Sequence, residues 1–419
     1  MSIPRTYILM GGFVTEAFSR AGSVSGSMAR ISGKPFLEWQ LLWLARQGFT
    51  EVVLLADGEN DGLREYFGDG GSWGVSLEYA SIADCNGLEC GESGTPSCRS
   101  SDVCVFLSDS VLFDIPLAWL VEYYRASLPG NSVCAALRYS DKPSRSGWIS
   151  VENSWEITTT QEKSEAQKEG YLNTGICVAG ADLINNTGRG IASIENDFFA
   201  GLTSQKKLFG IPFGGKFIDI GLADNSSTYE FHLREWLTEE KAPALFLDRD
   251  GILIEDTGYV QNPDNLVFKD RFFTLARRAQ EKGFRIVVLS NQAGVAKGIL
   301  SVEDVERVND RIYKKFETYG ILPTAIYWCP YHERGLLPEW TRFSLQRKPE
   351  PGMALKAMEE HAIDPLSSVM VGDKNTDRIR LPYLRSFIVP GRYPVDDSGD
   401  FADIEAVENY IESYRMNSY

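Results

Sequence analysis

The sequence predicts an α/β protein of two domains, each with a mostly parallel sheet covered by helices. Short apolar runs alternate with amphipathic segments along most of the 419 residues, which is the pattern of successive βαβ units. The alternation forms two series, and a polar segment that ends at Ala242 and Pro243 separates them. The length also suits two domains, since a domain commonly contains roughly 100–200 residues.

The first series defines a domain over residues 1–240. Its elements are buried strands at 7–10, 52–56 and 103–107 and helices at 34–47 and 114–126. A polar helix is expected at 226–241, and Pro243 ends it because proline cannot continue a helix. We therefore place the domain boundary near residue 240.

The second series defines a domain over residues 241–419. Its strands are expected at 244–247, 285–289, 326–328 and 369–371, and its helices at 270–283, 302–319 and 353–361. This alternation is typical of a doubly wound sheet, in which ligands bind beyond the carboxyl ends of the strands. Polar side chains that directly follow these strands are therefore candidates for a functional site.

Composition and charge narrow the classes of function. Hydrophobic residues make up 43% of the chain, which is enough for packed cores. The formal net charge of -16 argues against nucleic acid or an anionic membrane as the main partner, because both bind basic surfaces. The chain has no apolar stretch approaching about 18 residues and no signal-peptide pattern after Met1, so we expect a cytoplasmic protein.

Cysteine usage does not indicate a metal cluster. Cys85, Cys90, Cys98 and Cys104 lie in or beside a Gly/Ser-rich stretch, but their spacing contains no Cys-x-x-Cys pair. Reduced thiols are the simpler interpretation in a cytoplasmic protein.

Two aspartates directly follow the strand expected at 244–247. Asp248 and Asp250 are one residue apart and would project into the crevice at the strand end. One carboxylate can attack phosphorus to form an aspartyl-phosphate, and the other can give a proton to the leaving oxygen and later take one from water. An Asp-x-Asp pair is common in surface loops, so it needs supporting motifs.

Three further blocks provide that support. Ser290 and Asn291 end the next strand, where a hydroxyl and backbone N–H groups can hold phosphate oxygens. Arg347 and Lys348 offer positive charge to a phosphate, and Asp373 follows the strand at 369–371 and suits Mg²⁺. Each block alone could be a helix cap, a basic turn or an acidic turn. Four blocks in this order, three of them at strand ends, favour a phosphatase.

The four blocks resemble the haloacid dehalogenase superfamily, and within it the branch of D-glycero-D-manno-heptose 1,7-bisphosphate phosphatases and histidinol phosphatases. The similarity covers about residues 243–395 and includes Asp248-Arg249-Asp250-Gly251, Gly258-Tyr259-Val260, the segment 290–298, Arg347-Lys348-Pro349 and Gly372-Asp373-Lys374. The resemblance implies a Rossmann-like domain without a large cap domain.

The resemblance also implies a role for each site residue. Asp248 would be the nucleophile and Asp250 the acid and base. Ser290, Asn291 and Lys348 would bind the phosphate end of the substrate, and Arg347 would help grip the rest of it. Mg²⁺ would be held by Asp248, Asp373 and the backbone carbonyl of Asp250.

The sequence departs from this branch at a zinc loop that many members carry. Cys329 and His332 keep part of the first half, but residues 344–346 supply no thiolate. Two ligands cannot complete a tetrahedral structural site, so we expect no zinc. We expect the loop at 329–347 to be held by its own packing, through Leu336, Leu337, Trp340 and Phe343.

Residues 7–235 resemble the sugar-phosphate nucleotidyltransferases, which have a GT-A, Rossmann-like fold. Gly11 and Gly12 lie where that family has its triphosphate loop. The resemblance implies that Asp109 and Asp219 hold Mg²⁺ and that Lys163 contacts a sugar phosphate. A nucleotide is then a candidate ligand of this domain.

Two departures affect this domain. Glu16 stands where the family has a phosphate-binding arginine, and 26–28 replaces a segment that carries a lysine. Losing both cations should remove much stabilisation of the transition state. Two alternatives stay open: an active nucleotidyltransferase with unusual contacts, or a degenerate domain that binds a sugar phosphate, a nucleotide or a partner or supports a homo-oligomer.

Together these observations predict a Mg²⁺-dependent phosphoric monoester hydrolase in nucleotide-sugar biosynthesis. The preferred substrate is D-glycero-D-manno-heptose 1,7-bisphosphate, hydrolysed through an aspartyl-phosphate. The alternatives are a histidinol-phosphate phosphatase, a bifunctional phosphatase and nucleotidyltransferase, and a nucleotide-sugar binding scaffold without catalysis.

Overall fold

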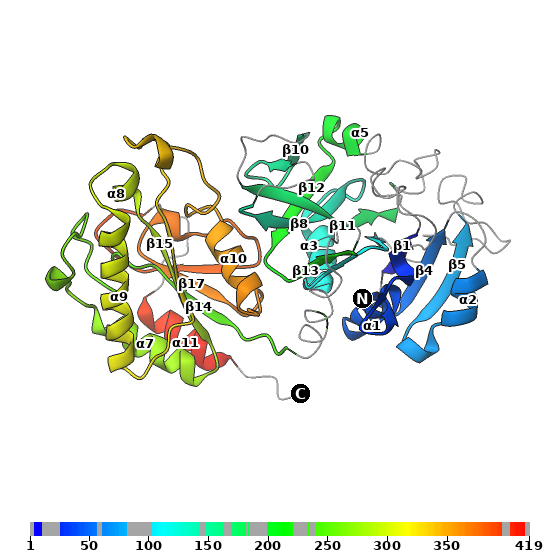
Figure 1. Ribbon diagram of the computed structural model, residues 1–419, viewed down its shortest axis with the longest axis horizontal. Helices are drawn as coiled ribbons and strands as arrows, with labels where there is room; N and C mark the ends of the chain where they lie inside the picture. Colours follow the sequence, from blue (N-terminus) through cyan, green and yellow to red (C-terminus); the bar gives the residue numbers. More distant parts are fainter. Residues whose placement is uncertain are drawn as a thin grey trace. The chain divides into compact units, whose positions relative to one another are not determined.

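The computed structural model describes residues 4–10, 26–56, 61–81, 103–142, 148–161, 169–181, 183, 199–220, 233, 239–395 and 403–414. The chain divides into two compact units, Met1–Glu239 and Glu240–Tyr419. Figure 1 shows the elements of each unit. Most of the helix expected at 226–241 and the cysteine-rich stretch at 84–101 lie outside the described residues.

The first unit contains strands, short 3-10 helices and α-helices. In chain order they are β1 (Arg5–Leu9), η2 (Gly26–Met28), β2 (Arg30–Ile31), β3 (Lys34–Pro35), α1 (Phe36–Arg46), β4 (Glu51–Ala56), α2 (Asp61–Phe67), η3 (Gly71–Trp73), β5 (Ser76–Ser81), β6 (Val103–Ser108), β7 (Val111–Phe113), α3 (Leu117–Ser127), β8 (Val133–Ser140), β9 (Trp148–Val151), β10 (Ile157–Gln161), β11 (Gly170–Gly180), α5 (Phe199–Ser204), β12 (Leu208–Phe213) and β13 (Phe217–Asp219).

The large sheet of the first unit is mixed rather than mostly parallel. Strands β6, β1, β4 and β5 are parallel neighbours, as the alternating pattern predicts. Beyond β6 the long strand β11 runs antiparallel to β6, β8 and β9, and β12 pairs in parallel with β8. Crossover connections give parallel neighbours, so the antiparallel pairs of β11 depart from the expected pattern of successive βαβ units.

A two-stranded sheet lies next to the end of β6. Strand β13 pairs antiparallel with β7, so that Asp219 lies opposite Val111. The amide of Ile220 donates to the carbonyl oxygen of Ser110 at 3.0 Å. The pairing thus brings residue 219 to the segment that directly follows β6.

The second unit also alternates strands and helices. In chain order they are β14 (Ala244–Leu247), η7 (Pro263–Asn265), α7 (Asp270–Glu281), β15 (Arg285–Asn291), α8 (Ala293–Ala296), α9 (Val302–Thr318), β16 (Ala325–Cys329), η8 (Pro338–Trp340), α10 (Gly352–Glu360), β17 (Val369–Gly372), η9 (Asn375–Asp377), β18 (Arg385–Ile388) and α11 (Ile404–Ser413).

The sheet of the second unit is parallel throughout its five strands, in the order β16-β15-β14-β17-β18. Strand β14 is at the centre, and all four of its residues are buried. A short strand that is apolar on both faces is typical of a parallel sheet covered by helices on each side. Because the strands are parallel, the residues that follow β14, β15 and β17 lie at one edge.

Helices cover both faces of this sheet (Figure 1). Side chains of α7, α9 and α11 form one core with alternate residues of the strands, among them Leu245, Leu247, Ile286 and Val288. Helix α10 lies on the opposite side and contacts β15 and β16. Helix α9 begins with a capping box in which Ser301 and Asp304 satisfy each other's backbone amides. The architecture confirms the predicted α/β fold class.

The helices that the structure describes include none with the length and apolar character needed to span a bilayer.

Candidate active site

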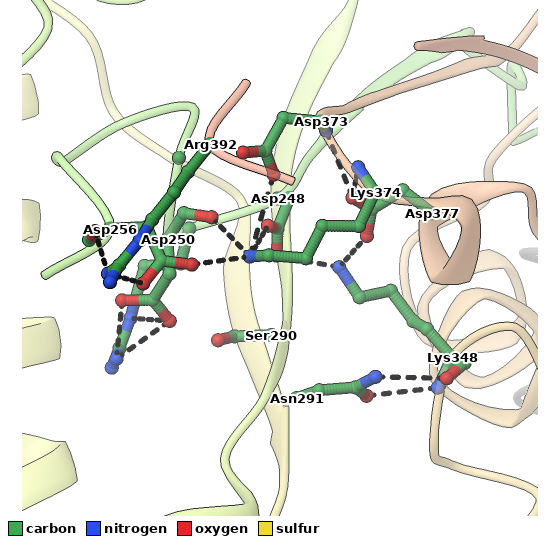
Figure 2. Close-up of polar contacts among 12 residues, drawn as sticks. Asp248, Asp250, Asp256, Ser290, Asn291, Lys348, Asp373, Lys374, Asp377 and Arg392 are labelled. Carbon is green, nitrogen blue, oxygen red and sulfur yellow. Dashed lines mark hydrogen bonds and ion pairs between the residues drawn. The ribbon is translucent and has the colours of Figure 1, made fainter. Parts of the chain in front are cut away.

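The motifs at the strand ends of the second unit converge on one point (Figure 2). Asp248 follows β14, Ser290 and Asn291 end β15, and Asp373 follows β17. Lys348 reaches the same point from the segment before α10. The structure therefore brings together the phosphatase residues that the sequence predicts, at the edge where parallel strands end.

Lys348 is the buried cation at the centre of the site. Its ammonium nitrogen lies 2.7 Å from Oδ1 of Asp248 and 2.6 Å from Oδ1 of Asp377. The side chains of Lys348 and Asp377 are 1% exposed and that of Asp248 is 5% exposed, so water screens these charges little. One ammonium group thus serves two carboxylates.

The three groups titrate as a coupled set. Burial alone would raise the pKa of Asp248, but the ammonium groups of Lys348 and Lys374 outweigh burial and hold this pKa below its ordinary value. Burial and the neighbouring Asp248 raise the pKa of Asp377. Burial would lower the pKa of Lys348, but the two carboxylates raise it instead. Asp248 is therefore held in its ionised form, as a nucleophile must be.

Asp373 is a carboxylate prepared for a cation. It is fully buried, and neither of its oxygens has a hydrogen-bond partner among the described residues. Burial, together with the charges of Asp248 and Asp377, raises its pKa to about 6, although Lys374 opposes the rise. A buried carboxylate without hydrogen bonds is costly unless it coordinates a metal or pairs with a charge.

The donor set fits Mg²⁺. Carboxylate oxygens of Asp248, Asp373 and Asp377 lie within 4.8 Å of one another, and this is the one group of three or more potential ligands in the described part of the chain. Hard oxygen ligands are the ones that Mg²⁺ prefers. The three carboxylates, and the oxygens of Asp373 that make no hydrogen bond among the described residues, are compatible with the Mg²⁺ site expected from the sequence.

A second lysine, Lys374, contacts Asp248, Asp373 and the backbone of Asp250. The ammonium nitrogen of Lys374 lies 2.7 Å from the carbonyl oxygen of Asp250, 3.6 Å from Oδ2 of Asp248 and 3.5 Å from Oδ1 of Asp373. It also pairs with Asp256 at 3.0 Å. Figure 2 shows these contacts meeting at one nitrogen. No role for Lys374 is predicted from the sequence.

A glycine gives Asp373 its space. Gly251 has a φ of +104°, and a Cβ atom there would collide with the carboxylate of Asp373. Glycine adopts positive φ without the steric cost that other residues incur. The turn after β14 can therefore bring the carbonyl oxygen of Asp250 and the carboxylate of Asp373 to the same place.

Asp250 is held by its chain neighbour and by the end of β15. Arg249 donates from Nε to Oδ2 at 3.1 Å and from Nη2 to Oδ1 at 3.0 Å. Gln292 donates to Oδ2 of Asp250 and to Oγ of Ser290, both at 2.8 Å. Gln292 therefore links the predicted acid to the predicted phosphate-binding hydroxyl.

The Asn291 side chain binds the backbone of Lys348. Its Nδ2 donates to the carbonyl oxygen of Lys348 at 2.9 Å, and its Oδ1 accepts from the amide of Lys348 at 3.0 Å. Arg347 donates to the carbonyl oxygen of Tyr331 at 3.3 Å and is half-buried. The structure thus gives Asn291 a contact that fixes the backbone of a cationic residue.

The loop at 329–347 is held only in part by the residues that the sequence predicts. Leu336 is 78% exposed and Phe343 is 56% exposed, so the expectation that they pack the loop is wrong. Trp340 packs as predicted: its ring lies 5.5 Å from that of Tyr331 and rests against a cluster of Val295, Leu300 and Val305. Backbone amides of residues 336 and 337 also donate to the carbonyl oxygen of Ala296. Backbone hydrogen bonds to Ala296 and the ring of Trp340 therefore attach the loop to the rest of the second unit.

The two residues that the sequence keeps from the zinc loop, Cys329 and His332, have other contacts. Cys329 is buried, with Sγ 4.0 Å from the carbonyl oxygen of Tyr331. Nδ1 of His332 accepts from the amide of Arg334 at 2.9 Å. Burial and then the nearby Arg347, Lys297 and Arg334 lower the pKa of His332, so its ring is neutral at pH 7.

In the first unit, the described residues include only part of the predicted site. Asp109 is buried at the end of β6, and Asp219 ends β13 opposite Val111. The two aspartates therefore lie on neighbouring segments. Lys163, Glu16 and the glycines at 11 and 12 lie outside the described residues.

Sequence reasoning missed the partners of the predicted residues. Asp377 and Lys374 lie within the motif that begins at Gly372, and their spacing from Asp373 was a usable signal. Asn309, which contacts Arg249 at 3.2 Å, is a polar residue on the buried stripe of α9. A polar residue in an apolar helical stripe was the only sequence signal for that contact.

Known proteins resemble both parts of the chain. Residues 245–406 match the family model described as polynucleotide kinase 3 phosphatase, and residues 7–209 match the one described as nucleotidyl transferase. A D-glycero-beta-D-manno-heptose-1,7-bisphosphate 7-phosphatase of Yersinia pestis is 38% identical over 138 residues, which are 33% of this chain and 73% of the relative. The corresponding alpha-heptose enzyme of Burkholderia mallei is 39% identical over 137 residues, 33% of this chain and 72% of the relative.

A solved structure that matches this chain is also of a heptose bisphosphate phosphatase. The D,D-heptose 1,7-bisphosphate phosphatase from B. bronchiseptica, in complex with magnesium and phosphate, is 21% identical with a TM-score of 0.34. The similarity covers 41% of this chain and 98% of that one. The sequence matches confirm the resemblances predicted for the two halves of the chain.

Proposed function

The chain belongs, through its second unit, to the D-glycero-D-manno-heptose-1,7-bisphosphate 7-phosphatase family, and we propose that it hydrolyses a heptose 1,7-bisphosphate through an aspartyl-phosphate on Asp248. One observation carries the proposal. Asp248 is a buried carboxylate that Lys348 keeps ionised at 2.7 Å, and the orphaned carboxylate of Asp373 lies beside it.

The residues divide the reaction into two steps. An oxygen of Asp248 forms a bond to phosphorus while the bond from phosphorus to the sugar oxygen breaks, and Asp250 gives its proton to that oxygen. Water then attacks the phosphorus of the aspartyl-phosphate and passes a proton to Asp250. The bond from phosphorus to Asp248 breaks, and the enzyme returns to its starting state. Lys348 offsets negative charge in both steps.

Asp248, Asp373 and the carbonyl oxygen of Asp250 would hold Mg²⁺, as the fit of the donor set supports. When bound, the ion neutralises the charge of the nucleophile and of a phosphate oxygen as they approach. Asp377 would remain with Lys348, at 2.6 Å, and position it. Ser290 would donate its hydroxyl to the phosphate, and Gln292 would orient that hydroxyl.

The test is phosphate release from a panel of sugar phosphates in the presence of Mg²⁺. The panel contains both anomers of heptose 1,7-bisphosphate, because the curated relatives differ in the anomer that they are named for. Asp248→Asn is the blank, since it keeps the size of the side chain but removes the nucleophile. Wild-type turnover that equals the blank on every compound would refute the proposal.

Turnover of histidinol phosphate distinguishes the main alternative within the superfamily, a histidinol-phosphate phosphatase, from the proposed heptose bisphosphate phosphatase. Three cationic residues, Lys297, Arg334 and Arg347, and one carboxylate, Glu333, surround His332, and we propose that a substrate meets this net-positive rim. This positive rim disfavours an amine-bearing substrate and favours one with a second phosphate. We therefore expect kcat/KM to be higher for heptose bisphosphate, and the reverse order would assign the chain to histidinol phosphate.

We propose a nucleotide-dependent role for the first unit as a second candidate function. The pairing of β13 with β7 brings Asp219 to the segment after Asp109, and two such carboxylates can hold Mg²⁺ beside a nucleotide. Release of pyrophosphate from a nucleoside triphosphate plus a heptose 1-phosphate, lost in Asp109→Asn, would establish a transferase. Absence of release with every nucleoside triphosphate would leave binding as the role to be measured.

A further inference from the structure

Arg249 is an arginine buried inside the second unit, and the mechanism above gives it no task. It is 2% exposed, which is rare for an arginine unless its charge is paired. The turn that carries it is closed by its own carbonyl oxygen, which accepts from the amides of Leu253 and Ile254 at 3.0 and 3.1 Å. These two hydrogen bonds fix the backbone of Arg249 and so limit the directions that its side chain can take.

The guanidinium group of Arg249 connects two elements. Nε and Nη2 bind the carboxylate of Asp250 side-on, at 3.1 and 3.0 Å. Nη1 donates to Oδ1 of Asn309 at 3.2 Å. Asn309 is 8% exposed and comes from the stripe of α9 that otherwise packs apolar residues into the core. A polar residue at such a position needs a partner, and Arg249 is that partner.

These contacts leave the two oxygens of Asp250 unequal. Oδ2 accepts from Arg249 Nε and from Gln292 Nε2, at 3.1 and 2.8 Å. Oδ1 accepts from Arg249 Nη2 at 3.0 Å. Among the described contacts Oδ1 is thus the less occupied oxygen. The Asp250 side chain is also more exposed, at 15% against 2% for Arg249, so it is the member of this pair that solvent reaches more readily.

We propose that Arg249, anchored by Asn309, is a positioning residue that aims Oδ1 of Asp250 at the leaving oxygen of the substrate. The inference rests on the proposed function and deepens it. Side-on binding by a planar guanidinium fixes the plane of a carboxyl group, which a single donor cannot do. The same guanidinium is adjacent to the negative charge that forms as Asp250 gives its proton to the sugar oxygen.

The effect of positioning depends on the leaving group. A sugar alkoxide is a poor leaving group and needs a proton as the bond to phosphorus breaks. p-Nitrophenolate leaves without one. A group that acts through Asp250 should therefore matter for heptose 1,7-bisphosphate and matter little for p-nitrophenyl phosphate. A group that merely supports the fold or the metal ligands should affect both substrates equally.

The experiment compares single-turnover rates with enzyme in excess over each substrate, in saturating Mg²⁺. Release of the sugar or the nitrophenolate in such a turnover reports the transfer of phosphate to Asp248 and excludes the later hydrolysis, in which Asp250 acts as a base. The variants are Arg249→Met, Arg249→Lys and Asn309→Leu, with Asp250→Asn as the reference for complete loss of the acid. Arg277→Met, an exposed arginine of α7 paired with Glu281, is the matched control for loss of a guanidinium.

We expect Arg249→Met to slow the heptose reaction about 10–100-fold, because general acid catalysis contributes about 10²–10⁴-fold and part of it survives misorientation. The p-nitrophenyl reaction should change less than about threefold. Arg249→Lys should fall between Arg249→Met and wild type, and Asn309→Leu should show the same selectivity with a smaller loss. Arg277→Met should match wild type on both substrates.

Equal slowing of both substrates by Arg249→Met, or no slowing of either, would overturn the inference. Circular dichroism and the Mg²⁺ dissociation constant, measured by calorimetry, check that each variant is folded and binds the ion. If Arg249→Met does not fold, Asn309→Leu and Arg249→Lys decide by the same comparison. Failure of the proposed function would look different: wild type and Asp248→Asn would then be equally inactive toward heptose 1,7-bisphosphate.

Discussion

Replacing Lys348 with methionine tests the electrostatics of the site through stability. Methionine keeps most of the side-chain length but removes the ammonium group that lies between Asp248 and Asp377. Both carboxylates are at most 5% exposed, so neither can recover its hydration in place. Removing one partner from a buried ion pair commonly costs about 3–5 kcal/mol, because a charge is left without compensation.

We expect the metal-free Lys348→Met variant to lose about 3–5 kcal/mol in the free energy of unfolding of the second unit. For a domain of about 180 residues, 1 kcal/mol corresponds to about 2–4 °C in Tm, so the midpoint should fall by roughly 6–20 °C. The assay is urea and thermal unfolding in EDTA, with the transition of the second unit recognised as the one that Mg²⁺ shifts upward. The loss should shrink when Mg²⁺ is added, because the ion supplies Asp248 with a new positive neighbour.

A double-mutant cycle makes the test specific. Asp377→Asn removes one of the two stranded carboxylates, so Lys348→Met should cost less in that background. Residues in one ion-pair network typically show coupling of about 0.5–3 kcal/mol. A Lys348→Met variant within about 1 kcal/mol of wild type, together with no coupling to Asp377→Asn, would refute the reasoning.

Three further predictions concern the metal ligands and their supports. The pKa of Asp373 is raised from 3.8 to about 6 in the folded, metal-free protein, so its protonated form adds stability at low pH that is lost as the pH rises through about 6. Conversely, the Mg²⁺ affinity measured by calorimetry should fall as the pH drops below about 6, because protonation removes the charge that binds the ion. An affinity that stays flat between pH 5 and 7 would contradict this prediction. Lys374→Met should bind Mg²⁺ about tenfold more tightly or better, since an ammonium group near the ligand oxygens repels the ion; weaker binding would show that Lys374 supports the ligands. Asn291→Ala should lower kcat by about tenfold with little change in KM, because it loosens the backbone of Lys348, and a change confined to KM would instead indicate direct contact with the substrate.

The strand-end residues were accessible from the sequence because parallel strands make their position predictable. An apolar run such as 244–247 predicts a buried strand, and a buried parallel strand fixes where its following residue lies. Asp248, Ser290 and Asp373 were found in this way. Lys348 was identified from a motif rather than from a strand, and its placement required the resemblance to a known family.

The contacts that these residues make with one another could not be predicted from the sequence. The pairing of Arg249 with Asn309 joins positions 60 residues apart and depends on how α9 packs on the sheet. Tertiary packing also decides which of the four apolar residues predicted to hold the loop at 329–347 are buried: Trp340 packs against a buried cluster, whereas Leu336 and Phe343 are exposed. In the first unit, the strands from β8 to β12 alternate too weakly in polarity to reveal their antiparallel pairing.

The central position of β14 in its sheet affects how the second unit folds during synthesis. One neighbour of β14 is β15, which follows within about 40 residues, but the other is β17, which begins at Val369. During synthesis the nucleophile strand therefore emerges long before its second neighbour exists, and an apolar edge remains exposed meanwhile. A ribosome-bound chain that stops short of residue 369 should accordingly engage chaperones, and protection of β14 from hydrogen exchange should begin only once β17 has left the exit tunnel.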